Sequence, residues 1–408
     1  MTMSDFSSRQ VIEALRSGVP SRAVGAYFSE ARPQMMKRLT GRMDQLQTDG
    51  SSGGMIFTGR YGEGKTHLLN TAFSMAAEKN MAVSYVALGK ETPIDKPDQL
   101  YRKVIAQTYL PGAKQPGFRA RLEESLTPGS NVTGELLAYT ARELQTDRIY
   151  YLLKALIGAQ EEDDREVLLA DLEGDFTTDG IIKKIYRRVT GMPAKFSQTF
   201  SKTKHAMDYF CFMSHLFRSF GLDGWVLLFD EAELMGRYSK KGRAKAYVSM
   251  QKFLRPDTGL EQSLSIFAFS SSYAEDVIDR KHEFDVVKSV WSDDPDALKA
   301  SNASLNAILA APELAPLTKE EIRRILVSIQ EFHGKAYDWT PSVSEETLLK
   351  ASENGGYLLR TKIRAAIEFL DQLYQYGEVG ETKITDLGKE CLDDDETEIP
   401  ELDELDIL

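Results

Sequence analysis

The sequence predicts an α/β fold, in which a parallel sheet is sandwiched by helices and is followed by a small helical unit. Three observations support this expectation. A short apolar run leads into a glycine-rich turn and then into a helix-like stretch at residues 55–70. A second apolar run, residues 225–229, is uninterrupted, as in strands that are buried on both faces of a parallel sheet. Beyond Pro316 the sequence shows helical periodicity and no strand-like run.

The length and composition are those of a globular protein with two or three domains and one large core. No apolar run approaches the ~20 residues that cross a membrane. The first residues lack the apolar segment of a signal peptide. The two cysteines, Cys211 and Cys391, lie in unlike surroundings and are interpreted as reduced thiols. We therefore expect a cytoplasmic protein without a membrane segment.

Negative charge is concentrated at the C-terminal end of the sequence. The formal net charge is −12, and residues 393–408 contain nine acidic residues and no basic one. The remainder is nearly neutral, so the overall acidity is only a weak argument against nucleic-acid binding. We expect residues 381–408 to form a solvated, disordered tail. A partner-docking peptide and a mimic of DNA charge are alternative interpretations of the tail.

Hydrophobic periodicity, together with the positions of proline and glycine, predicts the elements of the core. An amphipathic helix at 9–18 ends at Gly18, and Val19-Pro20 continues in an extended conformation. We expect the helices of residues 1–50 to pack on a core formed by residues 51–310. The other expected helices span 29–48, 65–78, 98–108 and 201–220, and the expected strands span 55–58, 82–88, 225–229 and 264–269.

Residues 112–200 are expected to form a helical insertion into this core. Helices are predicted near 133–158, 164–173 and 181–189. The last of them, IIKKIYRRV, is basic; phosphate contact is one interpretation, and a solvated helix face is the one we favour. A second basic run at 237–245 has five positive charges and is interpreted as a solvated helix start. A DNA or subunit contact is the alternative for this run.

A proline-bounded stretch at 312–316 marks the expected start of a C-terminal helical unit, residues 311–380. Helices are predicted at 318–335, 343–353 and 357–376. Thr318, followed by glutamate three residues later, has the spacing of a capping box. We interpret this unit as a small helical lid on the α/β core.

The glycine-rich turn has the spacing of a phosphate-binding loop. Residues 59–66, GRYGEGKT, fit the pattern G-x-x-x-x-G-K-[ST] without a mismatch. Glycines allow successive N–H groups to point at phosphate oxygens, and the following helix adds the positive end of its dipole. Lys65 is expected to reach the β- and γ-phosphates of ATP, and Thr66 to bind Mg²⁺. The candidate nucleotide-binding residues are Gly59, Tyr61, Gly62, Glu63, Gly64, Lys65, Thr66 and His67.

Two acidic residues end the second buried strand, where ligands bind in open α/β sheets. Asp230 is expected to hold Mg²⁺, and Glu231 to activate the attacking water as general base. Hydrolysis needs a carboxylate beside the metal-binding acid and simple binding does not, so an ATPase is favoured. Ser270 or Ser271, at the tip of the next strand, is expected to orient this water. Serines also end strands for simple turn reasons, which is the alternative.

The order of these parts resembles the AAA+ branch of P-loop ATPases: glycine loop, Asp-Glu strand, polar strand tip and helical lid. The resemblance implies a P-loop, AAA+-like sheet and a lid that contributes an arginine to the site. Arg360, which opens the last lid helix, is the first candidate to reach the γ-phosphate. Arg364, one turn further on, is the second. An exposed arginine on a helix surface is the alternative interpretation.

A closer resemblance is to the BREX (bacteriophage exclusion) ATP-binding protein family of the BrxD type. These matches span about residues 10–110 and 200–375. The family often has Gly-Thr-Pro after the Asp-Glu strand, where this chain has Phe269-Ser270-Ser271, so the water-orienting residue is an open question. The matching segments are ALRSGVPSR at 14–22, ETP at 91–93 with LYR at 100–102, DEAE at 230–233 and RTKIRAAIEFLD at 360–371.

The BREX resemblance implies a cytoplasmic AAA+-like ATPase of a bacterial or archaeal anti-phage system. It implies protein partners of the helicase, methyltransferase or nuclease type, with direct or indirect DNA contact. A homo-oligomer is compatible with it. Val19, Pro20 and Arg22 would line the adenine pocket, and Arg280 or Arg237 would act in trans on a neighbouring site.

The function that these observations favour is hydrolysis of ATP to remodel or recruit a nucleic-acid-acting partner in phage defence. One alternative is a nucleotide-gated scaffold or sensor that does not hydrolyse ATP. Another is an initiator-like DNA loader.

Overall fold

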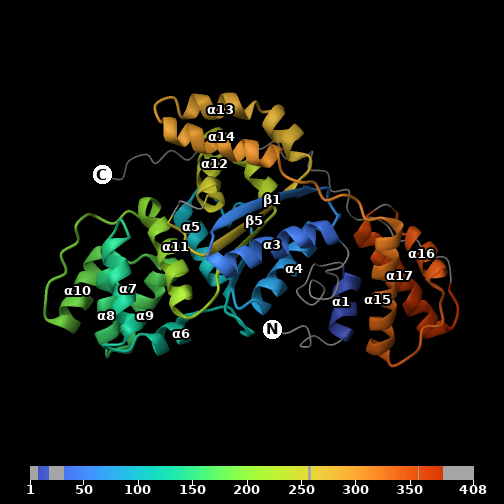
Figure 1. Ribbon diagram of the computed structural model, residues 1–408, viewed down its shortest axis with the longest axis horizontal. Coiled ribbons are helices and arrows are strands. Elements are labelled where there is room, and N and C mark those ends of the chain that lie inside the picture. The colour runs from blue at the N-terminus through green and yellow to red at the C-terminus, as the bar shows by residue number, and fades with distance from the viewer. Residues whose placement is uncertain (1–7, 18–31, 256–258, 357, 380–408) are drawn as a thin grey trace.

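A five-stranded sheet lies at the centre of the molecule (Figure 1). The computed structural model describes residues 8–17, 32–255, 259–356 and 358–379. The strand order is β1-β5-β4-β2-β3, and every pairing is parallel except that of β3 with β2. The predicted α/β class with a mostly parallel sheet is confirmed. The strands are β1 (Gly53–Gly59), β2 (Ala82–Ala87), β3 (Thr108–Tyr109), β4 (Trp225–Asp230) and β5 (Ser263–Ser270).

Helices cover both faces of the sheet (Figure 1). Val226 and Leu228 of β4 point to the face covered by α3 and α4, while Trp225 and Leu227 point to the face covered by α5, α11 and α12. Side chains alternate between the two faces of a strand, so a strand with two covered faces needs an unbroken apolar run. These helices are α3 (Pro33–Asp49), α4 (Lys65–Glu78), α5 (Pro97–Ala106), α11 (Lys202–Ser219) and α12 (Lys240–Leu254).

The strand order places β5 between β1 and β4. Gly59 at the end of β1 is paired with Ser270 at the end of β5. On the other side of β4, Asp230 is paired with Ala87 of β2. The carboxyl ends of these parallel strands therefore meet at one edge of the sheet, where the glycine loop begins.

The predicted helical insertion is present, but it is divided differently from the expectation. The helix expected at 133–158 is two helices, because Thr146 in the connection between them donates its N–H to the buried carboxylate of Asp208, 2.8 Å away. The helix expected at 164–173 begins earlier and ends in a π-turn, in which Gly174 has a φ of +97°. The insertion contains α6 (Arg119–Ser125), α7 (Asn131–Arg142), α8 (Arg148–Gly158), α9 (Glu162–Ala170), η2 (Asp171–Asp175) and α10 (Asp179–Thr190).

A buried arginine holds the insertion together. Arg148 at the start of α8 has no exposed side-chain surface. Its guanidinium donates to Asp171 of η2 and Asp179 of α10, and its Nε lies 3.0 Å from the Tyr209 hydroxyl. A buried charge is stable only when it is paired and hydrogen-bonded. These bonds connect three elements of the insertion with α11.

The C-terminal unit consists of three helices, as the sequence predicts. Thr318 and Glu321 form the expected capping box: the Thr318 hydroxyl accepts the Glu321 N–H at 3.2 Å, and the Glu321 carboxylate accepts the Thr318 N–H at 2.7 Å. No helix of the described residues is both long and apolar enough to cross a membrane. The helices are α15 (Lys319–Tyr337), α16 (Glu345–Glu353) and α17 (Leu359–Tyr376), and η3 (Ala232–Arg237), η4 (Ala274–Asp279), α13 (Glu283–Val290) and α14 (Pro295–Leu309) precede them.

The first helix, α1 (Ser8–Ser17), lies against this C-terminal unit (Figure 1). Both N-terminal helices are expected on the core from the sequence; α3 packs there, whereas α1 packs between α15 and α17. Arg16 explains part of the difference, because its Nη2 lies 2.7 Å from a carboxylate oxygen of Asp371 on α17. The same oxygen lies 3.0 Å from Nε2 of buried His333 on α15. The side chains of α1 thus complete the core of the C-terminal helices.

Candidate functional site

The glycine loop joins β1 to α4. Gly62 and Gly64 have φ values of +79° and +92°, a region that L side chains rarely adopt, so both positions need glycine. Arg60 donates its N–H to the Glu63 carboxylate at 2.9 Å, which closes the loop on itself. Gly64 caps α4 without a side-chain hydrogen bond to the helix. The first N–H groups of α4 are therefore oriented for an anion.

Lys65 lies buried at the start of α4. Its Nζ donates to the carbonyl oxygen of Gly59 at 3.0 Å and lies 3.9 Å from a carboxylate oxygen of Glu233. Gly59 ends β1 and Glu233 follows β4, so Lys65 contacts both sides of the tip of β5. An ammonium group held by one carbonyl and one distant carboxylate can exchange these contacts for the oxygens of a phosphate.

Asp230 and Thr66 meet at the hydroxyl of Tyr85, which comes from β2. The Tyr85 hydroxyl donates to buried Asp230 at 2.6 Å, and the Thr66 side chain lies close enough to this hydroxyl to lower its pKa slightly. Burial, followed by the charge of Asp230, raises the pKa of Tyr85, so this hydroxyl stays protonated. The two predicted magnesium ligands thus lie around one common group.

Glu231 has a strained backbone at the end of β4. Its φ is +53°, in the left-handed region, which costs a non-glycine residue roughly 1–3 kcal/mol. Its N–H donates to the Asp230 carboxylate at 2.9 Å. The side chain reaches the surface, but the surrounding protein removes part of its hydration. This desolvation, together with the charge of Asp230, raises the pKa of Glu231, while Lys65 lowers it.

Glu233 is part of the site, although the sequence assigned it no role. One of its carboxylate oxygens accepts the N–H of Ser270 at 3.1 Å, and the other is the oxygen near Lys65. Desolvation raises its pKa, and Lys65 lowers it. The turn η3 returns this carboxylate to the strand tips. The signal in the sequence was the third acid of the DEAE run; for Tyr85 it was a hydroxyl in an apolar strand.

The tip of β5 is tied to the glycine loop. Ser271 donates its N–H to the carbonyl oxygen of Gly59 at 3.2 Å, the same oxygen that holds Lys65. The Ser270 hydroxyl lies 3.1 Å from the Ser272 hydroxyl. Ser270 therefore lies at the expected strand tip. Its backbone N–H is linked to Lys65 through the carboxylate of Glu233, which contacts both groups.

The C-terminal helices reach the loop through α17. Leu358 lies against Gly62, where an added Cβ would come within 3.2 Å of the leucine side chain. Arg360 is exposed, and its Nη1 lies 3.4 Å from the hydroxyl of Tyr61. Arg364 follows one turn later and is half-buried. The structure therefore places Arg360 beside Tyr61 on the outer side of the loop.

One comparison with known proteins gives a match that includes the glycine loop. Residues 3–127 match the family model described as "BREX system ATP-binding protein BrxC/D". This part of the chain is BrxC/D-like. The matched region contains the glycine loop and Tyr85, and it ends before Asp230. It confirms the BREX resemblance for this region at the level of BrxC/D, and it does not extend to the matching segments expected at 200–375. No curated protein matches the chain.

The remaining candidate residues comprise two arginines, one histidine and three residues of the N-terminal segment. Arg280 forms an ion pair of 3.1 Å with Asp276 one turn earlier, and Arg237 is exposed at the end of η3. His67 follows Thr66 within α4. The three candidates for the adenine pocket lie outside the described residues, although they fall within the BrxC/D-like region; they are Val19, Pro20 and Arg22.

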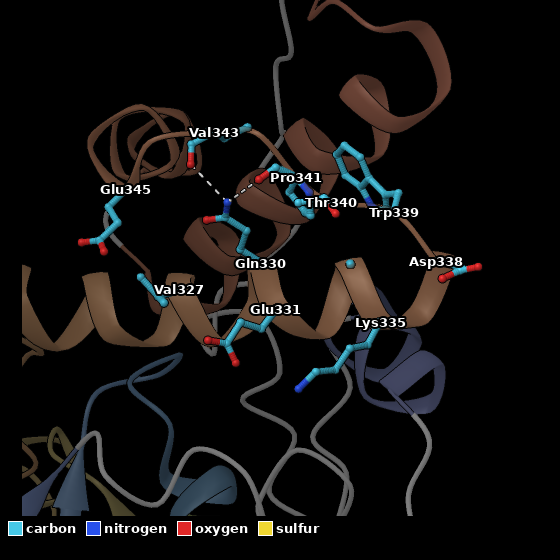
Figure 2. A pocket seen from close by; sticks show the side chains of 11 residues that line it. Val327, Gln330, Glu331, Lys335, Asp338, Trp339, Thr340, Pro341, Val343 and Glu345 are labelled. Carbon is cyan, nitrogen blue, oxygen red and sulfur yellow. Dashed lines mark hydrogen bonds between the residues drawn. The ribbon is translucent and has the colours of Figure 1, made fainter.

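A cavity of about 660 Å³ lies on the C-terminal helices, away from the glycine loop. It opens between α15 and the connection to α16, and Figure 2 shows Gln330 at its centre. The Gln330 side chain donates to the carbonyl oxygens of Pro341 and Val343 at 3.0 and 3.1 Å. None of the predicted site residues lines this cavity. It belongs to the packing of the connection rather than to the nucleotide site.

Replacing Tyr85 with phenylalanine should raise the Mg²⁺ concentration that half-maximal ATP turnover requires. Asp230 and Thr66 would lose the hydroxyl that orients them, and removal of a residue that orients a metal ligand weakens metal affinity about tenfold. Titration of turnover with Mg²⁺ measures this shift. Tyr238→Phe is the matched control, since its half-buried hydroxyl bonds to the carbonyl of Gly89 instead. An unchanged Mg²⁺ requirement in Tyr85→Phe would contradict the assignment.

Proposed function

We propose that this protein binds ATP and Mg²⁺ at the glycine loop and hydrolyses ATP as an AAA+-like P-loop ATPase. The observation that carries the proposal is the meeting of Thr66 and Asp230 at the Tyr85 hydroxyl, beside Lys65 and Glu231. The description of the matched family, an ATP-binding protein of the BREX system, supports ATP as the ligand.

The residues present fit a nucleotide and its metal. Two left-handed glycines and the free start of α4 suit a chain of phosphates. A hydroxyl and a carboxylate, from Thr66 and Asp230, are the oxygen donors that Mg²⁺ prefers. When bound, the metal would neutralise charge on the β- and γ-phosphates.

The side chains then have distinct tasks. Lys65 would leave Gly59 and Glu233 and bind the terminal phosphates. Glu231, with its raised pKa, would accept a proton from the attacking water. Ser270 is proposed to help to orient this water, and its link to Lys65 through Glu233 supports the tip of β5 as the sensor of the γ-phosphate.

The C-terminal helices are proposed to act as a lid. Arg360 would move from Tyr61 toward the γ-phosphate, and Arg364 is the second choice for this role. Leu358 rests on the loop itself, so loading of the loop would shift α17 and, with it, α1. ATP binding and hydrolysis would thus be converted into a lid movement.

In the cell, this movement is proposed to remodel or recruit a partner that acts on nucleic acid during phage defence. The BREX description of the matched family supports the setting, and a cytoplasmic location is part of the proposal. In a homo-oligomer, exposed Arg280 or Arg237 would serve the site of a neighbouring subunit.

The test is release of phosphate from ATP by the full chain with Mg²⁺ and with EDTA. We expect turnover with Mg²⁺ and its loss with EDTA, since Thr66 and Asp230 would have no ion to present to the phosphates. A binding assay with labelled ATP runs in parallel. Tight, Mg²⁺-dependent binding without turnover, alone and with DNA, would contradict hydrolysis and support the nucleotide-gated scaffold.

A further inference from the structure

The helical insertion carries a concentrated basic segment in an acidic protein. Residues 180–204 contain seven lysines and arginines and no acidic residue, although the whole chain has a net charge of −12. The segment comprises most of α10 and the connection to α11. A local imbalance of this size creates a positive potential on the surface even when the overall charge is negative.

Packing fixes the basic face of α10 toward solvent. Ile182, Ile185 and Tyr186 form its buried stripe. Lys183, Lys184 and the following Arg187 are exposed on the remaining surface. A helix with a fixed buried stripe cannot rotate, so these cations stay on the outside.

The connection after α10 runs back along the helix and adds to the same surface. The Lys183 ammonium lies 4.7 Å from the centre of the Phe196 ring, so the residue next to that ring, Lys195, lies close to the basic face. Further on, the N–H of Phe200 lies 3.4 Å from the carboxylate of Asp179, at the start of α10. We define the basic surface as Lys183, Lys184, Arg187, Lys195 and Lys204, all of which are exposed.

Three acidic residues near this surface are already paired with other cations. Asp179 accepts from Arg148, and Asp164 of α9 accepts from Arg188. Lys202 lies 3.9 Å from Asp98. In the described part of the chain, no carboxylate lies within ion-pair distance of the five cations of the basic surface. They are therefore available to an external anion.

The aromatic residues of this region favour a particular kind of anion. Tyr151 packs edge-on against Tyr186 at a centroid distance of 5.0 Å, and it packs against Phe196 in a tilted arrangement at 5.3 Å. Rings packed on one another do not offer faces on which unpaired bases can stack. The surface therefore presents charge without a stacking platform, which suits the phosphate backbone of a duplex.

We propose that the basic surface binds the phosphate backbone of double-stranded nucleic acid without sequence preference. Figure 1 shows α10 at the opposite end of the long axis from the C-terminal helices. The contact would hold the substrate of the recruited partner near the insertion while the lid moves at the other end. This deepens the proposed function but is independent of turnover, because it needs no nucleotide.

The test is the anisotropy of a fluorescent 20-base-pair DNA titrated with full-length protein at several salt concentrations, without ATP. The variant is Lys184→Glu/Arg187→Glu. The control, Lys240→Glu/Lys241→Glu, has the same charge change at exposed positions of the other basic run. Each lost phosphate contact lowers the slope of log affinity against log salt by about 0.9, so we expect a decrease of roughly two in the variant. Its affinity should fall at least about tenfold, and the control should resemble wild type.

Other outcomes would overturn the proposal. They include an absence of duplex binding by wild type, an equal loss in the control, and stronger binding of single strands than of duplexes.

The acidic stretch 393–408 is a competing occupant, tested with a labelled peptide of that sequence. If the double variant loses the peptide but not the DNA, the surface binds the tail instead. Duplex RNA, used as a second probe, should bind in the same way as DNA if the backbone alone is recognised. None of these binding results would contradict the proposed ATPase, because that proposal is tested separately by release of phosphate from ATP.

Discussion

Glu231→Gln should retain ATP but lose its turnover. Glutamine keeps the size of the side chain and can still donate and accept hydrogen bonds, but it cannot take a proton from water. Loss of a general base lowers the rate about 10²–10⁴-fold. We expect this decrease in the rate of phosphate release, with the dissociation constant of labelled ATP changed by less than about threefold.

Glu233→Gln is the matched control for this prediction. Glu231 follows β4 and Glu233 lies two residues later in η3; both have raised pKa values, which the charge of Lys65 opposes in both cases. Glu233, however, bonds to the N–H of Ser270, and glutamine retains an oxygen for that bond. We expect only a moderate change in turnover. If Glu233→Gln abolishes turnover and Glu231→Gln does not, the two roles are exchanged.

The acidic limb of the pH profile gives an independent check on Glu231. A general base works as the carboxylate, so turnover is full above its pKa and is lost as the pH falls through it. Desolvation and the charge of Asp230 raise the pKa of Glu231, so this loss should begin at a higher pH than for an ordinary glutamate. Single-turnover rates as a function of pH measure it.

Lys65→Met should abolish ATP binding. Methionine retains much of the apolar stem of the buried lysine, but it removes the one ammonium group that lies between the loop and Glu233. The variant therefore loses attraction to the phosphates and leaves Glu233 facing them. A charge-assisted contact with each of two phosphates contributes about 1.5–3 kcal/mol, so we expect a decrease in affinity of at least 100-fold.

Replacement of Lys65 also affects the stability of the folded protein, so the ATP affinity of the variant is compared with its thermal unfolding. Lys65 lowers the pKa of Glu233, and in its absence this half-buried carboxylate is protonated more easily. Lys103→Met, at an exposed position of α5, controls for the loss of one positive charge. ATP affinity by fluorescence and the midpoint of thermal unfolding are the two measurements. A folded Lys65→Met protein that binds ATP as wild type does would exclude the loop as the phosphate site.

Much of this site was accessible from the sequence because its signals are local. The spacing of Gly59, Gly64 and Lys65 identifies the loop, and the helix predicted at 65–78 has the bounds of α4. The uninterrupted apolar run 225–229, followed by Asp230, identifies the strand that ends at the same edge of the sheet as the loop. Each of these signals depends on neighbours in the sequence, where backbone and burial constraints are strongest.

The missed parts depend on contacts between distant segments. Tyr85 is recognisable only once β2 is known to lie beside β4, and Glu233 only once η3 is known to turn back toward β5. The break near Thr146 depends on Asp208, which lies in another helix. The hydrophobic periodicity of a single helix or strand does not reveal which distant segment it contacts. The same is true of α1, whose amphipathic pattern is compatible with either the core or the lid.

The position of α1 has a consequence for the order of folding. Arg16 and Asp371 are separated by 355 residues, and among the described residues the apolar stripe of α1 is buried by the C-terminal helices. At about 5–20 residues per second, a ribosome needs roughly 20–70 s to make the sequence between them. For most of that time α1 has been synthesised and its partner helices have not. The C-terminal helices α15 and α17 therefore pack around a helix that was synthesised long before them.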